Sequence, residues 1–129
     1  MWDPLRRKEV ASTPEEGVRQ WFIGVLSKAG CPMGLMGSEV SLHYGSKSLR
    51  ADIVVYDRAG EPLMVVECKR PDVQIDTEVA QQALRYHGVL GVRFIGLTNG
   101  NNTYIYRREG KGFVAADRLP SYEEMLCQP

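Results

Sequence analysis

The sequence is poor in cysteine, in long apolar runs and in net charge. Its three cysteines, Cys31, Cys68 and Cys127, are an odd number without CxxC spacing, which favours reduced thiols in a cytoplasm over a disulfide framework or a zinc site. No stretch approaches the roughly 20 apolar residues that span a bilayer. The first residues, MWDPLRRKEVASTPEE, lack the apolar centre of an export signal. We therefore expect a cytoplasmic protein with no membrane partner.

Net charge is also absent, because 16 basic residues balance 16 acidic ones. This balance gives no support for strong binding to nucleic acid without regard to sequence. Basic residues do cluster locally at 6–8, 69–70 and 107–108, but such a cluster alone is more often a solvated surface than a binding site. Repeats and low-complexity tracts are missing as well, so the sequence offers no evidence for an array or a linker.

What is present is the composition of an ordinary globular domain, with 43% hydrophobic and 25% charged residues in a chain of 129. A chain of this length can bury a core of its own. We predict a single domain over residues 1–129, in which residues 1–12 form an N-terminal extension that can be flexible.

A first helix is predicted from its end signals and an apolar stripe. Thr13 suits the N-cap, Pro14 the first turn and Gly30 the C-terminal stop, and Glu16 completes a capping box. Glu15 is expected at the head of the inward stripe and Glu16 outside it. The stripe itself has five members: Val18, Trp21, Phe22, Val25 and Leu26.

The remaining chain reads as strands interrupted by a second helix. The predicted strands are 38–45, 47–57, 62–69, 92–100, 102–108 and a weaker 112–120, and the helix covers 76–91. Two of the strands are almost continuously apolar, so both of their faces should be buried. We therefore predict an α/β fold in which a central mixed β-sheet is flanked by helices, in the order αβββαββ.

Charged residues end one of these apolar strands. Side chains alternate along a strand, so Glu67 and Lys69 should share a face. The loop of residues 57–62 predicts a hairpin that can contain a bulge, and a slip of one residue would turn Asp52 away from Glu67. The predicted register has three pairs: Asp52 with Glu67, Val54 with Val65, and Tyr56 with Leu63.

In this register two carboxylates and an amine converge. Asp52 and Glu67, with the carbonyl of Cys68, are oxygen ligands suited to a hard cation such as Mg²⁺. Lys69 can orient or help deprotonate a water and offset charge in phosphodiester hydrolysis. The competing interpretation is an ordinary ion pair at a strand end, which is more common for an isolated ExK.

The second helix supplies further polar candidates. Gln82 falls in the same arc as the predicted inward residues Val79, Ala83, Tyr86 and Leu90. Gln82 either finds backbone partners in the core or contacts the metal site or a nucleotide, with Tyr86 packed beneath it. On the first helix, Glu15 either points at the same centre or only stabilises the helix N-terminus.

Several of these segments together resemble a known family. The pattern D…ExK…QxxxY, formed by Asp52, Glu67, Lys69, Gln82 and Tyr86, resembles the PD-(D/E)xK nuclease superfamily. More narrowly, TPEEGVRQ, RADIVVYD, VVECKRP, QALRY and LTNG, in this order, resemble the N-terminal nuclease domain of type I restriction enzyme R subunits. The similarity covers about residues 13 to 106. Ala51 replaces the proline of the superfamily's name, which matters little because Asp52 would touch the metal.

The resemblance implies a restriction-endonuclease-like core and a Mg²⁺-dependent DNA endonuclease, with Mn²⁺ as an alternative cofactor. Asp52 and Glu67 would bind the metal. The implied catalytic residues are Glu15, Asp52, Glu67, Lys69 and Gln82, and Glu16 is the alternative to Glu15. The implied DNA contacts are Arg70, Gln82, Arg85 and Tyr86.

R subunits also carry an ATP-driven motor, whereas this chain has no GxxxxGK phosphate loop and no room for a motor. The expected partners are therefore DNA and either a larger restriction or helicase complex or a second copy in a homodimer. The alternative function is a non-cleaving DNA- or nucleotide-binding accessory module with the same fold. A purely structural domain is the third interpretation.

Overall fold

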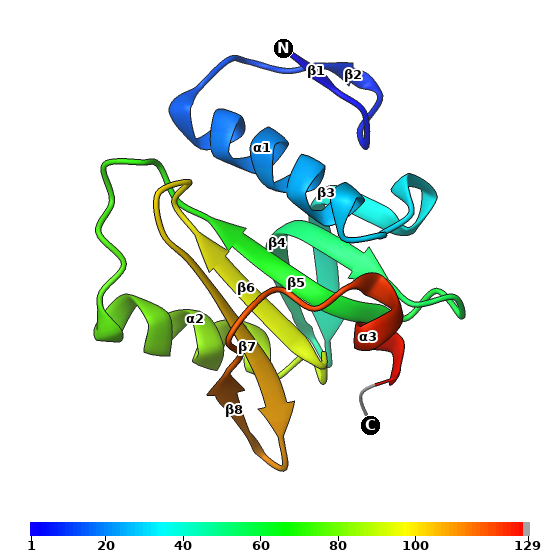
Figure 1. The fold of residues 1–129 in the computed structure, drawn as a ribbon, viewed down its shortest axis with the longest axis vertical. Helices are drawn as coiled ribbons and strands as arrows, with labels where there is room; N and C mark the ends of the chain where they lie inside the picture. The colour runs from blue at the N-terminus through cyan, green and yellow to red at the C-terminus, as the bar shows by residue number, and fades with distance from the viewer. Residues whose placement is uncertain (128–129) are drawn as a thin grey trace.

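The computed structural model describes residues 1–127, which form a six-stranded sheet, a small separate hairpin and flanking helices (Figure 1). The strands are β1 Trp2–Asp3, β2 Lys8–Glu9, β3 Met36–Tyr44, β4 Lys47–Tyr56, β5 Pro62–Cys68, β6 Phe94–Thr98, β7 Thr103–Glu109 and β8 Gly112–Ala115. The helices are α1 Pro14–Lys28, the 3₁₀ turn η1 Met33–Leu35, α2 Thr77–Gly88 and α3 Tyr122–Cys127. Within these residues, no helix is long and apolar enough to cross a membrane.

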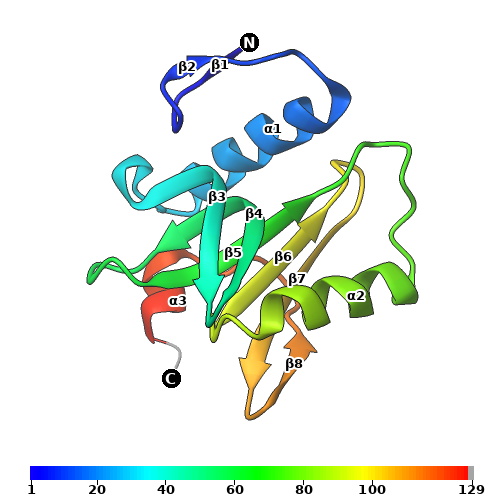
Figure 2. The same cartoon turned by 180° about the vertical axis from the view of Figure 1, so that it is seen from behind.

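The sheet is mixed and covered on both faces, as predicted. Its strand order is β3-β4-β5-β6-β7-β8, and only β5 and β6 run parallel because α2 provides the crossover between them. α1 and α3 lie on one face and α2 on the other (Figures 1 and 2). The apolar strand residues therefore divide between two cores, one against α1 and α3 and a smaller one against α2.

α1 begins and ends where the sequence predicts. The Thr13 hydroxyl accepts from the Glu16 N–H at 3.1 Å, and Gly30 ends the helix with a φ of +97° that favours glycine. The other hydrogen bond of a capping box, from the Thr13 N–H to the Glu16 side chain, was predicted wrongly, because this N–H donates to Ala11 O at 3.1 Å. Trp21 was also placed wrongly in the inward stripe, because it is 48% exposed.

The predicted hairpin register is confirmed at its centre. Val54 pairs with Val65, and the pairs on either side follow the same register. The pairing of Tyr56 with Leu63 is wrong: a bulge after Val55 shifts the register, so that Tyr56 pairs with Pro62. The bulge accommodates the extra length of the connecting loop.

Short elements at both ends of the chain were not predicted. The hairpin of β1 and β2 precedes α1, and its Asp3 is fully buried. Burial alone would raise the pKa of Asp3, but hydrogen bonds from Ser38, Arg6 and the Leu5 N–H outweigh it and lower that pKa to about 2. The flexibility expected for residues 1–12 stays a prediction. At the other end, α3 covers the sheet.

Two neighbouring residues of α1 provide a test of its orientation. Phe22 is 1% exposed and lies in the larger core. We expect Phe22→Ala to lower the free energy of unfolding by about 3–5 kcal/mol, and the half-exposed Trp21→Ala to lower it by less than about 1 kcal/mol. Urea denaturation measures both. Equal losses in the two variants would contradict the observed orientation.

Candidate active site

β4 and β5 part at the end of the sheet that carries the predicted site residues. Their backbone pairing stops at Ile53 and Val66, so the predicted backbone pair of Asp52 with Glu67 is not formed. Beyond that pair, the Asp52 carboxylate accepts from the Cys68 N–H at 2.6 Å, while the next N–H, of Lys69, donates to a carbonyl of β6 at 2.8 Å. We call this place the strand fork. Because a buried N–H needs an acceptor, the Asp52 side chain replaces the backbone partner that Cys68 has lost.

Glu67 lies beside the fork, and both of its oxygens have partners. One is 2.8 Å from Lys69 Nζ and the other is 3.0 Å from Nε2 of His87 on α2. The hydrogen bond with His87 is the main reason that the pKa of Glu67 falls to about 2; burial opposes the shift, and Lys69 adds to it. The predicted contact between Glu67 and Lys69 is thus present, and Glu67 is ionised at neutral pH.

Asp52 has the opposite electrostatic environment. Burial raises its pKa, and the negative charge of Glu67 also raises it, while the Cys68 N–H and Arg19 work against the shift. The Arg19 guanidinium, from α1, lies 3.3 Å from the Asp52 carboxylate. The two carboxylates are therefore near enough to feel each other, and each is already close to a cation supplied by the protein.

Lys69 stays charged in this environment. Its hydrogen bond to Glu67 is the main reason that its pKa is raised; burial opposes the shift, and the charges of Glu67, Asp52 and Glu15 strengthen it. An amine with a raised pKa is an ammonium at neutral pH. The arrangement thus supports the part of the prediction in which Lys69 orients water and offsets charge, rather than the part in which it removes a proton.

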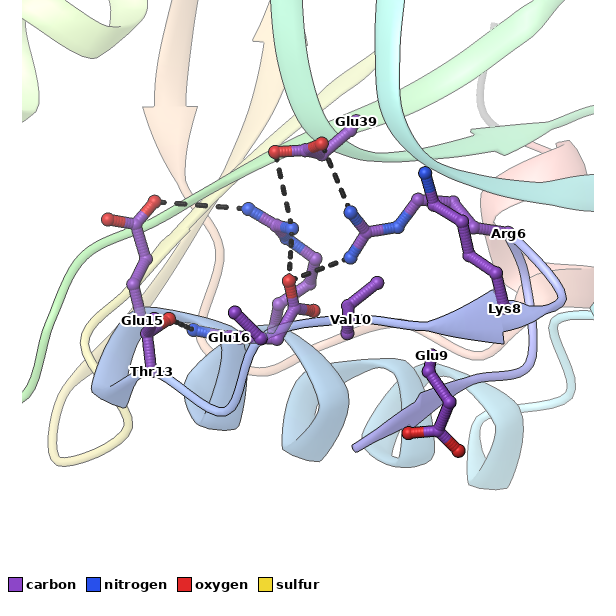
Figure 3. A pocket seen from close by; sticks show the side chains of 10 residues that line it. Arg6, Lys8, Glu9, Val10, Thr13, Glu15, Glu16 and Glu39 are labelled. Carbon is purple, nitrogen blue, oxygen red and sulfur yellow. Dashed lines mark hydrogen bonds and ion pairs between the residues drawn. The ribbon is translucent and has the colours of Figure 1, made fainter.

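Arg19 belongs to a wider set of charges beneath the N-terminal hairpin, which we call the arginine cluster: Asp3, Arg6, Glu16, Arg19 and Glu39. Figure 3 labels three of its members, Arg6, Glu16 and Glu39. Glu16 joins the two arginines, at 2.7 Å from Arg6 and 2.8 Å from Arg19. Glu16 is 7% exposed, so its expected position outside the inward face is wrong. Its side chain faces inward because the partly buried Arg6 and the buried Arg19 bind it there.

Glu15 lies between the arginine cluster and the fork. Its carboxylate is 3.9 Å from the Arg19 guanidinium nitrogen that also faces Asp52, and its side chain is 44% exposed. Glu15 is therefore the helical acid that faces the same guanidinium nitrogen as Asp52 and is open to solvent, whereas both oxygens of Glu16 are bound, one by arginines and the other by Gln20. This placement favours Glu15 over Glu16 as the acid that could act at the site.

α2 borders an open pocket of about 450 Å³ in front of Glu67 and Lys69, to which Gln82 and Tyr86 contribute. Gln82 and Tyr86 are exposed, so the prediction that they point into the core is wrong. The buried residues of α2 are Ala83 and His87. The Tyr86 hydroxyl instead accepts from a backbone N–H of β4 at 3.2 Å.

The two remaining predicted DNA contacts, Arg70 and Arg85, are both exposed, Arg70 on the loop after β5 and Arg85 on α2. Two residues that contact the site carboxylates were missed, Arg19 and His87. For Arg19 the sequence holds a signal, since it lies one helical turn from the buried Phe22 and two turns from Leu26. A charged residue on the apolar face of a helix needs a buried partner. For His87 the corresponding signal is its spacing of four residues from Ala83.

The donor atoms at the fork suit a hard cation. Among residues 1–127 no three His, Cys, Asp or Glu side chains surround a common metal position, but Mg²⁺ keeps several waters and needs only one or two protein carboxylates. Asp52 and Glu67 supply these. A soft metal fits poorly, because burial raises the pKa of the Cys68 thiol well above its usual range.

Comparison with solved structures identifies the fold. A fragment assigned as an HsdR subunit of a type I restriction enzyme from Vibrio vulnificus superposes with a TM-score of 0.63 over 92% of this chain, at 21% identity. A protein from Anabaena variabilis assigned as a nuclease superposes with a TM-score of 0.53, at 17% identity, over 87% of this chain and 72% of its own. The fold is therefore the restriction-endonuclease-like α/β fold.

The family follows from the sequence match. Residues 14–120 match the family described as type I restriction enzyme R protein N terminus, and the chain belongs to that family. We find no match among curated proteins. The chain spans only 26% of the length of the Vibrio vulnificus structure.

Because the pKa of Glu67 is lowered, the free energy of unfolding should depend on pH in the acidic range. Because the folded state favours the ionised carboxylate, this contribution is complete above about pH 4.5 and is lost as the pH falls toward about 2. Between about pH 5 and about pH 3, we expect the free energy of unfolding of the wild type to fall by ~1–3 kcal/mol more than that of Glu67→Gln, which has no carboxylate to protonate at this position. Urea denaturation at several pH values measures this. Glu61→Gln, at an exposed turn residue, is the control and should follow the wild type; a Glu67→Gln variant that does the same would contradict the prediction.

Proposed function

We propose that this domain is a Mg²⁺-dependent DNA endonuclease that hydrolyses phosphodiester bonds, similar to the nuclease domain of type I restriction enzymes. The observation that carries the proposal is the strand fork, where Asp52 and Glu67 come from adjacent strands and Lys69 lies 2.8 Å from Glu67. The Cys68 N–H needs only an acceptor at position 52, which an uncharged amide could supply, so a carboxylate there is more than the backbone and the ion pair of Glu67 with Lys69 require. Membership of a restriction enzyme family supports the proposal independently.

In this proposal Asp52 and Glu67 hold the cation. When bound, Mg²⁺ polarises the scissile phosphate and makes its coordinated water more acidic. Glu67 enters this role ionised, as its pKa of about 2 ensures. Lys69, charged and on the same face as Glu67, orients the attacking water and offsets the negative charge that develops on the phosphate. Mn²⁺, which takes the same oxygen ligands, is an alternative cofactor.

DNA would approach over the pocket bordered by α2. Gln82 and Tyr86 line the same pocket as Glu67 and Lys69 and are exposed, so they are free to contact a nucleotide. Arg70 and Arg85 are exposed as well and would contact phosphates. Because the chain as a whole is neutral, we propose that its affinity for DNA is modest or supplemented by a partner.

Glu15 has a proposed role at the edge of the site. Its carboxylate is partly exposed, lies 3.9 Å from Arg19 and contributes to the raised pKa of Lys69. We assign it to the ordering of water or of a second cation next to Asp52. A single centre of this kind would cut one strand, so double-strand breaks would require two copies, in a homodimer or in a larger restriction or helicase complex.

The second candidate function is a DNA- or nucleotide-binding accessory module that does not cut. One observation favours it: Arg19 and Lys69 already place positive charge next to Asp52 and Glu67. A module of this kind would bind DNA through the same exposed residues without a divalent cation.

Cleavage assays distinguish the two functions. Circular and linear DNA are incubated with the protein, with and without Mg²⁺ or Mn²⁺. We expect metal-dependent cutting that falls about 100- to 1,000-fold in Lys69→Ala, because a charge that stabilises the transition state is removed. Lys111→Ala, at an exposed position in the turn between β7 and β8, is the matched control and should cut like the wild type. DNA binding without cutting by all three proteins would support the accessory module instead.

Metal binding provides a further prediction. Asp52→Asn and Glu67→Gln should each abolish cutting and weaken Mg²⁺ binding measured by calorimetry, since each removes a charged oxygen ligand. Circular dichroism checks that the variants remain folded, which is necessary because Asp52 also accepts a backbone hydrogen bond. Unchanged Mg²⁺ affinity in either folded variant would refute the assignment of that carboxylate as a ligand.

A further inference from the structure

His87 lies directly behind Glu67. It is 1% exposed, near the C-terminal end of α2, and its Nε2 is 3.0 Å from one oxygen of Glu67. The other oxygen of the same carboxylate faces Lys69 at 2.8 Å. The carboxylate is thus held at one oxygen by a fully buried ring and at the other by a side chain that borders the open pocket.

The surroundings of the ring determine which nitrogen carries the proton. Within residues 1–127, His87 Nδ1 is buried and has no hydrogen-bond partner. A proton on Nδ1 alone would leave a buried donor unsatisfied and would set the Nε2 lone pair against a carboxylate oxygen. With the proton on Nε2, the ring donates to Glu67 and only a lone pair is left without a partner. The geometry therefore favours donation from Nε2.

The residue before His87 reaches the other strand of the fork. The Tyr86 hydroxyl accepts from the backbone N–H of Arg50, two residues from Asp52, at 3.2 Å. The Tyr86 and His87 rings meet edge to face, with centroids 4.8 Å apart. Two consecutive residues of α2 thus connect to the two strands that have parted and that carry Asp52 and Glu67.

We propose that His87 is a positioning residue for the metal-binding carboxylate Glu67. By donating from Nε2 to one oxygen, it fixes the rotation of the carboxylate and leaves the second oxygen directed toward Lys69, where it would be available to a bound cation. This inference rests on the proposed function and goes beyond it, because it assigns a role to a residue outside the D…ExK…QxxxY pattern. Hydrogen-bond partners of metal ligands typically change metal affinity or activity about 10- to 100-fold when removed.

Two substitutions at His87 separate positioning from packing. His87→Leu fills the site without a donor, whereas His87→Gln keeps an N–H donor that can reach Glu67. We expect Mg²⁺ affinity, measured by calorimetry, to fall about 10- to 100-fold in His87→Leu and to recover largely in His87→Gln. His43→Gln is the control, because His43 is the only other histidine of the chain and is exposed on β3. Wild-type affinity in a folded His87→Leu would overturn the proposal.

Nuclear magnetic resonance of the wild-type protein tests the same claim without any variant. With only two histidines to label, ring ¹⁵N spectra report each tautomer separately. We expect His87 to carry its proton on Nε2, and added Mn²⁺ to broaden the His87 signals at concentrations that leave those of His43 sharp. A proton on Nδ1 alone, or equal broadening of both rings, would overturn the proposal.

The outcomes also separate this inference from the proposed function. If the wild type cuts DNA and a folded His87→Leu cuts it and binds Mg²⁺ equally well, the positioning role fails while the nuclease stands. The opposite outcome is a wild type that cuts no DNA, although His87 donates from Nε2, Mn²⁺ broadens its signals first and His87→Leu weakens Mg²⁺ binding. In that case the nuclease fails while the positioning role stands.

Discussion

A backbone N–H without a strand partner is the constraint around which the site is arranged. Where β4 leaves β5, the Cys68 N–H would be orphaned, and Asp52 satisfies it at 2.6 Å. The fold therefore requires an acceptor at position 52 even before any ligand binds. Glu67 follows from the same geometry, since it precedes Cys68 on β5 and turns toward α2. The fork thus brings two carboxylates close enough for the charge of Glu67 to raise the pKa of Asp52, and only Asp52 also satisfies a backbone N–H.

The main features of the fold and of the fork could be predicted from the sequence, because they depend on local rules. Strand alternation is enough to put Glu67 and Lys69 on one face. The loop between β4 and β5 is short, which leaves few registers that keep the apolar residues buried, and this is why the pairing of Val54 with Val65 was predicted correctly. The bulge before Tyr56 could be expected but not located, because either strand could have absorbed the extra residue.

Other features depend on contacts between distant parts of the chain. The apolar surface of Trp21 suggested burial, but α1 turns Phe22 and Leu26 into the core and buries Arg19 on the same side, where it reaches partners on β3 and β4. In α2, Tyr86 and His87 lie three and four residues after the buried Ala83, so helical spacing allows either to face inward. His87 is the buried one because it contacts Glu67 across the interface with the sheet. The hairpin of β1 and β2 is too short to show a periodic pattern. What holds it against the sheet is the set of hydrogen bonds that the buried Asp3 accepts, including one from Ser38 on β3.

The arginine cluster has a consequence for how its members can be studied. Arg6 and Arg19 share Glu16 and Glu39, and Arg19 extends the same set of contacts to Asp52. Four of the ions thus have at least two counter-ions each, namely Arg6, Glu16, Arg19 and Glu39, so removing one ion leaves the others to redistribute. Energies measured for single substitutions in such a set do not add up to the energy of a combined one. Double-mutant cycles, rather than single variants, therefore measure the energetic coupling between the N-terminal hairpin and the fork.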